Sequence, residues 1–196
     1  NTKGSILLKL KKTSEAIENF KVILSINPEN FYSLNGLANS YAYLEEFEKA
    51  ISLYKKAVSI NKNFSEAFAN LGLAFYHIRN NDEAIRNLKK SISLNSKSPE
   101  TYLNLGNAFL RKNKINEAIK SYENTITLNA KYSEAYNNKG NALVLLKKYD
   151  QAKVFFKKTL NLKSDFRLTL SSLIYIKMKT CDWDDFTQDY KNFKLN

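Results

Sequence analysis

The 196-residue chain has few of the residues that mark turns and irregular structure: five Gly and two Pro. Connections must therefore be short, which argues against an all-β sandwich or barrel. A single Cys, Cys181, excludes an internal disulfide, and with only one His we expect no metal site and no metal cofactor. No apolar run reaches the roughly 18 residues that a membrane-spanning helix needs, so we expect no membrane span.

Acidic residues are outnumbered, with 31 Lys and Arg against 19 Asp and Glu, for a net charge of +12. Such a field attracts nucleic acids and anionic surfaces. Only four of these cations are Arg, the residue that binds phosphates and bases bidentately, and the Lys residues are spread over the whole length. We therefore expect a solvated basic surface rather than nucleic-acid binding. A basic scaffold for an anionic partner stays open as an alternative.

What the sequence does contain is a repeat with a step of 34 residues. It is visible in five aligned series, three of which place small or aromatic residues at fixed positions. The three are Ala16, Ala50, Ala84, Ala118 and Ala152; Gly4, Ala38, Gly72, Gly106 and Gly140; and Phe20, Tyr54, Leu88, Tyr122 and Phe156. A period of this length is typical of arrays of short supersecondary units.

The repeat resembles the tetratricopeptide repeat (TPR), which also has 34 residues. Its first-half pattern is present as Leu71-Gly72-x2-Phe75, and its second-half pattern as Ala84-x3-Leu88. Of the late Pro of the family pattern only Pro28 remains, and Lys139 stands where the pattern has Leu. The resemblance implies an all-α, right-handed superhelical solenoid of antiparallel helix pairs with a concave inner surface. In that register the repeats are 1–30 (partial), 31–64, 65–98, 99–132, 133–166 and a degenerate 167–196.

Asn recurs at the helix ends of this register. Asn27, Asn61, Asn95 and Asn129 each follow the last apolar residue of a second helix. Because Asn tolerates the left-handed conformation that ends many helices, we interpret these four as structural C-caps. Ser98 followed by Pro99 predicts an N-cap and a first helical turn.

A second group of Asn residues is predicted to line the inner surface, which the family builds mainly from the first helix of each repeat. An amide side chain carries both a donor and an acceptor, so a row of amides could bind the backbone of an extended peptide without reading its side chains. The other interpretation is that they are simply solvated. The candidate peptide-binding residues are Asn35, Asn39, Asn70, Asn104, Asn107, Asn137, Asn138 and Asn141.

We therefore expect a protein-protein interaction module in the cytoplasm that binds an extended peptide or a partner helix. A clamp for a terminal carboxylate is not expected, because the register places Glu100 where such clamps have a cation. The chain contains no nucleophile-base pair, paired-carboxylate site or Gly-rich phosphate loop, so we expect no catalytic residues. The truncated first repeat should expose an apolar end that favours self-association.

The C-terminal segment is read in two ways. Trp183 is expected to pack inside, as Phe47 and Tyr149 do at the same register position, and the bulky Phe186 is expected to end the array. The run Cys181-Asp182-Trp183 also resembles the junction between the repeats and the catalytic domain of O-linked N-acetylglucosamine transferases. That resemblance implies a second hypothesis, in which these repeats recruit substrates for a larger glycosyltransferase.

Overall fold

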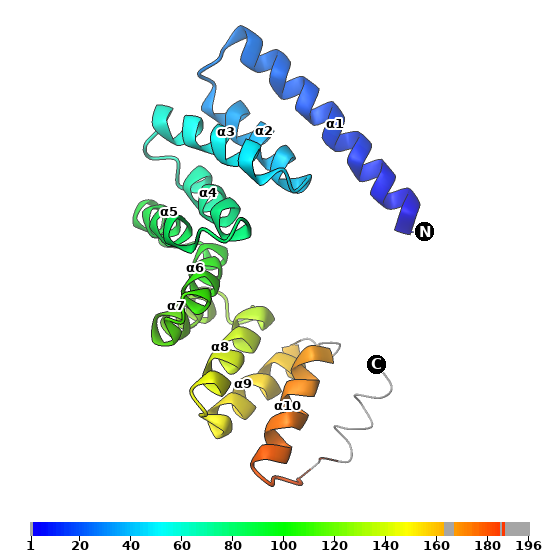
Figure 1. The fold of residues 1–196 in the computed structure, drawn as a ribbon, viewed down its shortest axis with the longest axis vertical. Helices are drawn as coiled ribbons and strands as arrows, with labels where there is room; N and C mark the ends of the chain where they lie inside the picture. The colour runs from blue at the N-terminus through cyan, green and yellow to red at the C-terminus, as the bar shows by residue number, and fades with distance from the viewer. Residues whose placement is uncertain (1, 163–166, 185, 187–196) are drawn as a thin grey trace. The chain divides into compact units, whose positions relative to one another are not determined.

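The computed structural model describes residues 2–162, 167–184 and 186, and within them every regular element is an α-helix (Figure 1). The all-helical expectation is therefore confirmed. The helices are α1 (Thr2–Ile26), α2 (Phe31–Tyr43), α3 (Phe47–Ile60), α4 (Ser65–His77), α5 (Asn81–Leu94), α6 (Pro99–Arg111), α7 (Ile115–Leu128), α8 (Ser133–Leu145), α9 (Tyr149–Leu162) and α10 (Arg167–Lys179).

The chain divides into two compact units, residues 1–96 and 97–196. In the first, α2 packs on α3 and α4 on α5, with α1 against α2 and α3 against α4. In the second, α6 packs on α7 and α8 on α9, with α7 against α8 and α10 against α9. Each unit is thus a stack of helix pairs, because one amphipathic pair cannot bury its apolar face without a neighbour.

The small-residue positions lie where paired helices approach most closely. A Cβ atom placed on Gly106 would lie 2.5 Å from Tyr122 Cε1, and one on Gly140 would lie 2.5 Å from Phe156 Cε1. Ala118 and Ala152 are fully buried, as are the aromatic rings of Tyr122 and Phe156. At Gly72, Gly106 and Gly140 the sequence series therefore records one repeated contact: a large side chain of the second helix packs against a Gly of the first.

The helix ends confirm the caps but correct their conformation. Ser98 accepts a hydrogen bond from the backbone N–H of Thr101 and caps α6, as predicted. Asn61 and Asn129 do end α3 and α7, yet both are extended (φ −117° and −145°) and not left-handed. Their side-chain oxygens accept from the backbone N–H two residues later, at 3.0 Å, so they act as Asx turns.

The left-handed residues lie instead in the turn between the two helices of a repeat. They are Glu45, Arg79, Asn113, Lys147 and Cys181, with φ between 51° and 62°. None is Gly, so the sequence gives no compositional sign of this turn. The five positions are spaced by the repeat length, which indicates that packing of the two helices imposes the conformation, against the preference of every residue there except Asn113.

The N-terminal segment differs from the expected helix pair. Residues Thr2–Ile26 form one continuous helix, and Lys11, at the register position of the left-handed turn residue, lies within it. Leu8, Leu10 and their Lys neighbours are strong helix formers. Local propensity therefore favours a helix that continues through the turn position.

At the other end of the described chain, α10 is the predicted first helix of the degenerate repeat. The expectation for Trp183 is wrong, because its side chain is 61% exposed and contacts Phe186 edge-on, with ring centroids 5.2 Å apart. Phe47 and Tyr149 begin helices and are carried inward by them, whereas Trp183 lies in the non-helical stretch after α10. The last part of the degenerate repeat, 187–196, falls outside the described residues.

Candidate functional site

The first helices of the repeats carry a hydrogen-bonded amide network in the N-terminal unit. Asn70 of α4 donates from Nδ2 to Asn39 Oδ1 of α2 at 3.1 Å and to Asn35 Oδ1 at 3.3 Å. Asn35 is buried and donates in turn to Glu66 Oε1 at 3.1 Å. The hydroxyl of Tyr54, on the second helix of the pair, donates to Asn39 Oδ1 at 2.6 Å. This network links α2, α3 and α4.

The C-terminal unit repeats the arrangement two repeats later. The Tyr122 hydroxyl donates to Asn107 Oδ1 at 2.9 Å, and Asn138 Nδ2 of α8 donates to the same oxygen at 3.0 Å. Asn137 Oδ1 accepts from the Thr169 hydroxyl of α10 at 2.6 Å, while its Nδ2 donates to Asn138 Oδ1 at 3.3 Å. Six of the eight predicted Asn residues are thus brought together in two separate networks.

These bonds fix which way each amide points. The oxygens of Asn39 and Asn107 each accept two bonds, so their Nδ2 groups are left as donors. In the N-terminal unit Asn70 uses its Nδ2 on both partners and keeps its Oδ1 as an acceptor. Burial, with a contribution from the charge of Glu66, raises the pKa of the Tyr54 hydroxyl, which therefore remains a donor at neutral pH.

Asn104 and Asn141 are not part of either network. In sequence register, Leu73 stands at the position that Asn39 and Asn107 occupy in the repeats that carry a network. Asn141 is exposed, and the matching residue of the second helix is Phe156, which has no hydroxyl to hold the amide. Neither side chain hydrogen-bonds to any residue within the described ranges.

Sequence reasoning missed Tyr54 and Tyr122 as part of this site. The signal was present: Asn and Tyr occur together 15 residues apart at 39 and 54 and at 107 and 122, whereas Leu73 is matched by Leu88. Because the aromatic series was interpreted only as packing residues, the Tyr hydroxyl was not considered as a hydrogen-bond donor. The pairing shows that the Tyr ring fills the core while its oxygen orients the amide.

Two pockets border these residues. One of about 120 Å³ in the N-terminal unit is lined by Tyr54, Asn70, Leu73 and His77 with their neighbours. Another of about 400 Å³ lies between α8 and α10, where Asn141 meets Val144, Leu145 and Tyr175. Ser171 and Ser172 open this second pocket, because earlier repeats have larger Asn or Leu side chains at most of these positions. Each unit therefore offers polar amides beside an apolar recess.

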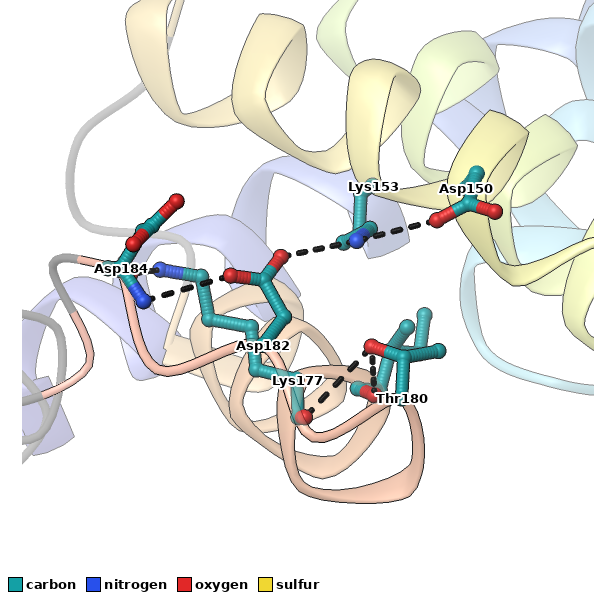
Figure 2. Close-up of polar contacts among 7 residues, drawn as sticks. Asp150, Lys153, Lys177, Thr180, Asp182 and Asp184 are labelled. Atoms are coloured by element: carbon teal, nitrogen blue, oxygen red, sulfur yellow. Dashed lines mark hydrogen bonds and ion pairs between the residues drawn. The ribbon is translucent and has the colours of Figure 1, made fainter.

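The most highly charged cluster lies at the end of the described chain and is structural (Figure 2). Lys153 of α9 forms ion pairs with Asp182 at 2.7 Å and with Asp150 at 3.0 Å. The fully buried Lys177 donates to the backbone oxygen of Asp184. Hydrogen bonding to Lys153 lowers the pKa of Asp182, and hydrogen bonding to Asp182 and Asp150 raises the pKa of Lys153. These contacts hold the turn after α10 against α9.

Within the described ranges no group of three or more His, Cys, Asp and Glu side chains could hold a metal ion. In the same residues no helix combines the length and the apolar character needed to cross a bilayer.

Comparisons with known proteins agree with this architecture. Models of the TPR repeat match residues 38–78, 80–113 and 106–147, and tetratricopeptide repeat models match 133–166 and 1–30. A comparison with curated proteins finds no match.

Among solved structures, a crystal structure of MamA is 30% identical, covers 78% of this chain and 89% of its own, and has a TM-score of 0.74. YrrB, described as a TPR protein with an unusual peptide-binding site, is 17% identical over 86% of this chain and 87% of its own, with a TM-score of 0.73. PilF of Pseudomonas aeruginosa is 20% identical over 94% and 78%, with a TM-score of 0.75. The last two show a shared fold only. With family models matching most of its length and helix pairs at the same spacing, the chain belongs to the tetratricopeptide repeat family.

Proposed function

We propose that the protein binds an extended peptide of a partner protein along the first helices of its repeats. The observation that supports this most directly is the fixed orientation of Asn39 and Asn107. Their oxygens are occupied by Tyr and Asn donors, which leaves each Nδ2 group as a donor for a ligand. An amide that was merely solvated would not need a buried Tyr hydroxyl to hold it.

The chemistry suits a peptide backbone. The Nδ2 groups of Asn39 and Asn107 would donate to peptide carbonyls, and Asn70 Oδ1 would accept from a peptide N–H. Because each such bond is made to the main chain, the amides add affinity without sequence preference. The adjoining pockets then supply whatever side-chain preference exists. YrrB, which shares the fold, is described as binding peptide, and this agrees with the proposal.

The proposal is tested by changing Asn39, Asn70 and Asn107 together to Ala and measuring binding to an array of random-sequence dodecapeptides. Loss of two or three net hydrogen bonds of about 0.5–1.5 kcal/mol each should weaken capture roughly tenfold or more. Asn161→Ala is the matched control, because Asn161 is an exposed amide on a second helix, α9. Equal capture by the triple variant and the control would remove the amides from the function.

The partner is proposed to be a protein, in the cytoplasm, with no catalysis by these residues themselves. The glycosyltransferase hypothesis depended on Cys181-Asp182-Trp183, and no observation now favours it. Cys181 is the left-handed residue of the sixth repeat's turn, and Asp182 pairs with Lys153. Both residues therefore have a sufficient structural role. A glycosyltransferase domain encoded in the same reading frame would revive that hypothesis.

Self-association through the N-terminal segment also remains a proposal. Val22, Ile23 and Ile26 are exposed on α1 and form apolar surface there. Analytical ultracentrifugation of the protein and of a Val22→Lys, Ile26→Lys double variant measures this self-association. If the double variant associates as strongly as the unaltered protein, the contact lies elsewhere.

A further inference from the structure

The repeats provide an internal standard against which unusual residues stand out. A side chain that folding requires should recur at each 34-residue step, so one that departs in a single repeat calls for another explanation. In the repeat 133–166, Lys139 stands where Leu37, Leu71, Leu105 and Leu173 stand elsewhere. Val154 replaces the polar Ser52, Arg86 and Lys120. Phe155 replaces Leu53, Asn87 and Ser121.

These three departures line one pocket. It has a volume of about 460 Å³ and is lined by residues of α7, α8 and α9 and by Lys148, which precedes α9, all in the C-terminal unit. Ile119, Leu143, Val154 and Phe155 supply its apolar lining, and Glu123, Lys139 and Lys148 its charges. Its size lies within the range of ligand pockets. Val154 is 64% exposed, so an apolar side chain faces solvent where other repeats have polar ones.

Lys139 is held inside this pocket at an energetic cost. Its side chain is only 13% exposed, its Nζ lies 2.7 Å from Glu123 Oε1, and it stands 4.2 Å from the centre of the Phe155 ring. Desolvating an ammonium group is unfavourable, and Leu fills the same position in four other repeats. Packing alone therefore does not account for a cation here. The Glu123 carboxylate is half exposed, which makes this partner exchangeable.

The surrounding sequence favours an acidic ligand. From Lys139 to Lys179 there are ten Lys and Arg residues and two Asp, and of the ten, Lys153 is paired with the acidic residues Asp150 and Asp182 described above. A partner carrying Asp or Glu would be attracted to this part of the chain. The pocket is also distinct from the amide site: Asn138 bonds to Asn107 of α6, whereas the adjacent Lys139 bonds to Glu123 of α7.

We propose that this pocket binds a segment of an acidic partner protein, independently of the amide site. An apolar side chain of the partner lies on Val154 and Phe155, and a neighbouring carboxylate of the partner replaces Glu123 on Lys139. The arrangement explains why an apolar surface and a shielded cation occur together in one repeat.

The probe is a fluorescein-labelled peptide of Glu and Gly around a single Leu, titrated against the full chain by fluorescence anisotropy. Lys139→Leu should weaken binding about tenfold, because the carboxylate loses its partner. Glu123→Gln should strengthen binding severalfold, because it removes the competing carboxylate. Val154→Ser should weaken it, and a probe with Lys in place of Glu should not bind.

Several controls make the result decisive. Lys139→Leu and Val154→Ser restore residues found in other repeats, so both should fold, which thermal melting by circular dichroism verifies. Val22→Ser changes an equally exposed apolar residue in the other unit, and Asn107→Ala changes the amide site; neither should affect this probe. Unchanged or tighter binding by Lys139→Leu overturns the proposal, as does weaker binding by Glu123→Gln or no binding by the unaltered protein.

Discussion

The Tyr54 hydroxyl donates a hydrogen bond to the side-chain oxygen of Asn39 at 2.6 Å, joining the core of a helix pair to the surface amide of its first helix. Tyr122 and Asn107 make the same contact two repeats later. Where the first-helix residue is Leu73, the second-helix residue is Leu88. The same pair of positions therefore determines both the packing of the helix pair and the orientation of the amide. A substitution at either position should affect both properties.

Replacing Tyr122 by Phe should separate the two roles. The ring is retained and Phe156 shows that it fits this position, so the protein should fold, with a loss of about 0.5–1.5 kcal/mol from the missing hydrogen bond. Asn107 should then be held only by Asn138 and bind peptide less well. Urea unfolding and peptide anisotropy measure the two effects. Tyr32→Phe is the control, because Tyr32 is exposed and should show neither effect.

Gly140→Val should destabilise the C-terminal unit by about 1–3 kcal/mol through overpacking. Its Cβ would stand 2.5 Å from the Phe156 ring, which is fully buried and has no space to yield. Asn141→Val places the same branched side chain one residue further along α8 at an exposed position. Chemical denaturation should show a large decrease in the free energy of unfolding for Gly140→Val and little decrease for Asn141→Val. Similar decreases would mean that helix propensity, and not the contact with Phe156, accounts for the destabilisation.

Asn81→Ile should stabilise the N-terminal unit by about 1–3 kcal/mol. In the part of the chain that the structure describes, Asn81 Oδ1 is a buried side-chain oxygen with no hydrogen-bond partner, and Ile115 occupies the same position one repeat later. The neighbouring Asn80→Ile should do the opposite, because Asn80 caps α5 by accepting from the N–H of Glu83. Thermal melting should show a higher melting temperature for Asn81→Ile and a lower one for Asn80→Ile than for the unaltered protein.

The ion pair of Lys153 and Asp182 should make stability depend on pH in a defined window. The pKa of Asp182 is lowered by Lys153, so its contribution is complete above the ordinary Asp value of 3.8 and is lost as pH falls through the lowered value. The pKa of Lys153 is raised, so the contribution is complete below 10.5 and is lost as pH rises through the raised value. Asp182→Asn should therefore melt earlier than the unaltered protein at neutral pH.

Two measurements complete this experiment. The difference in melting temperature should shrink below pH 3.8, where Asp182 in the unaltered protein also becomes protonated. Thr127→Ala, an exposed hydroxyl change on α7, should show a pH-independent difference. If the difference in melting temperature between Asp182→Asn and the unaltered protein stayed constant through the acid range, the charge of Asp182 would play no part in stability.

Much of the candidate site followed from register alone, because Asn39 and Asn70 had to lie on one helical face of neighbouring repeats. What register could not reveal is how amides use their own hydrogen bonds. Asn70 and Asn104 occupy the same register position, yet Asn70 donates to Asn35 and Asn39 whereas Asn104 has no hydrogen bond within the described residues. That difference depends on which side chains surround each amide in the folded protein.

The sequence by itself determined the helix pairs, their length and their closest contacts, because a 34-residue period of small and large apolar residues permits one way of burying each helix face. Only the tertiary structure decided where the chain departs from the regular pattern of its repeats. The extension of α1 through Lys11, the left-handed turn at Arg79 and the exposure of Trp183 each depend on which neighbour is present to pack against. That information belongs to contacts between helices and is absent from any one segment.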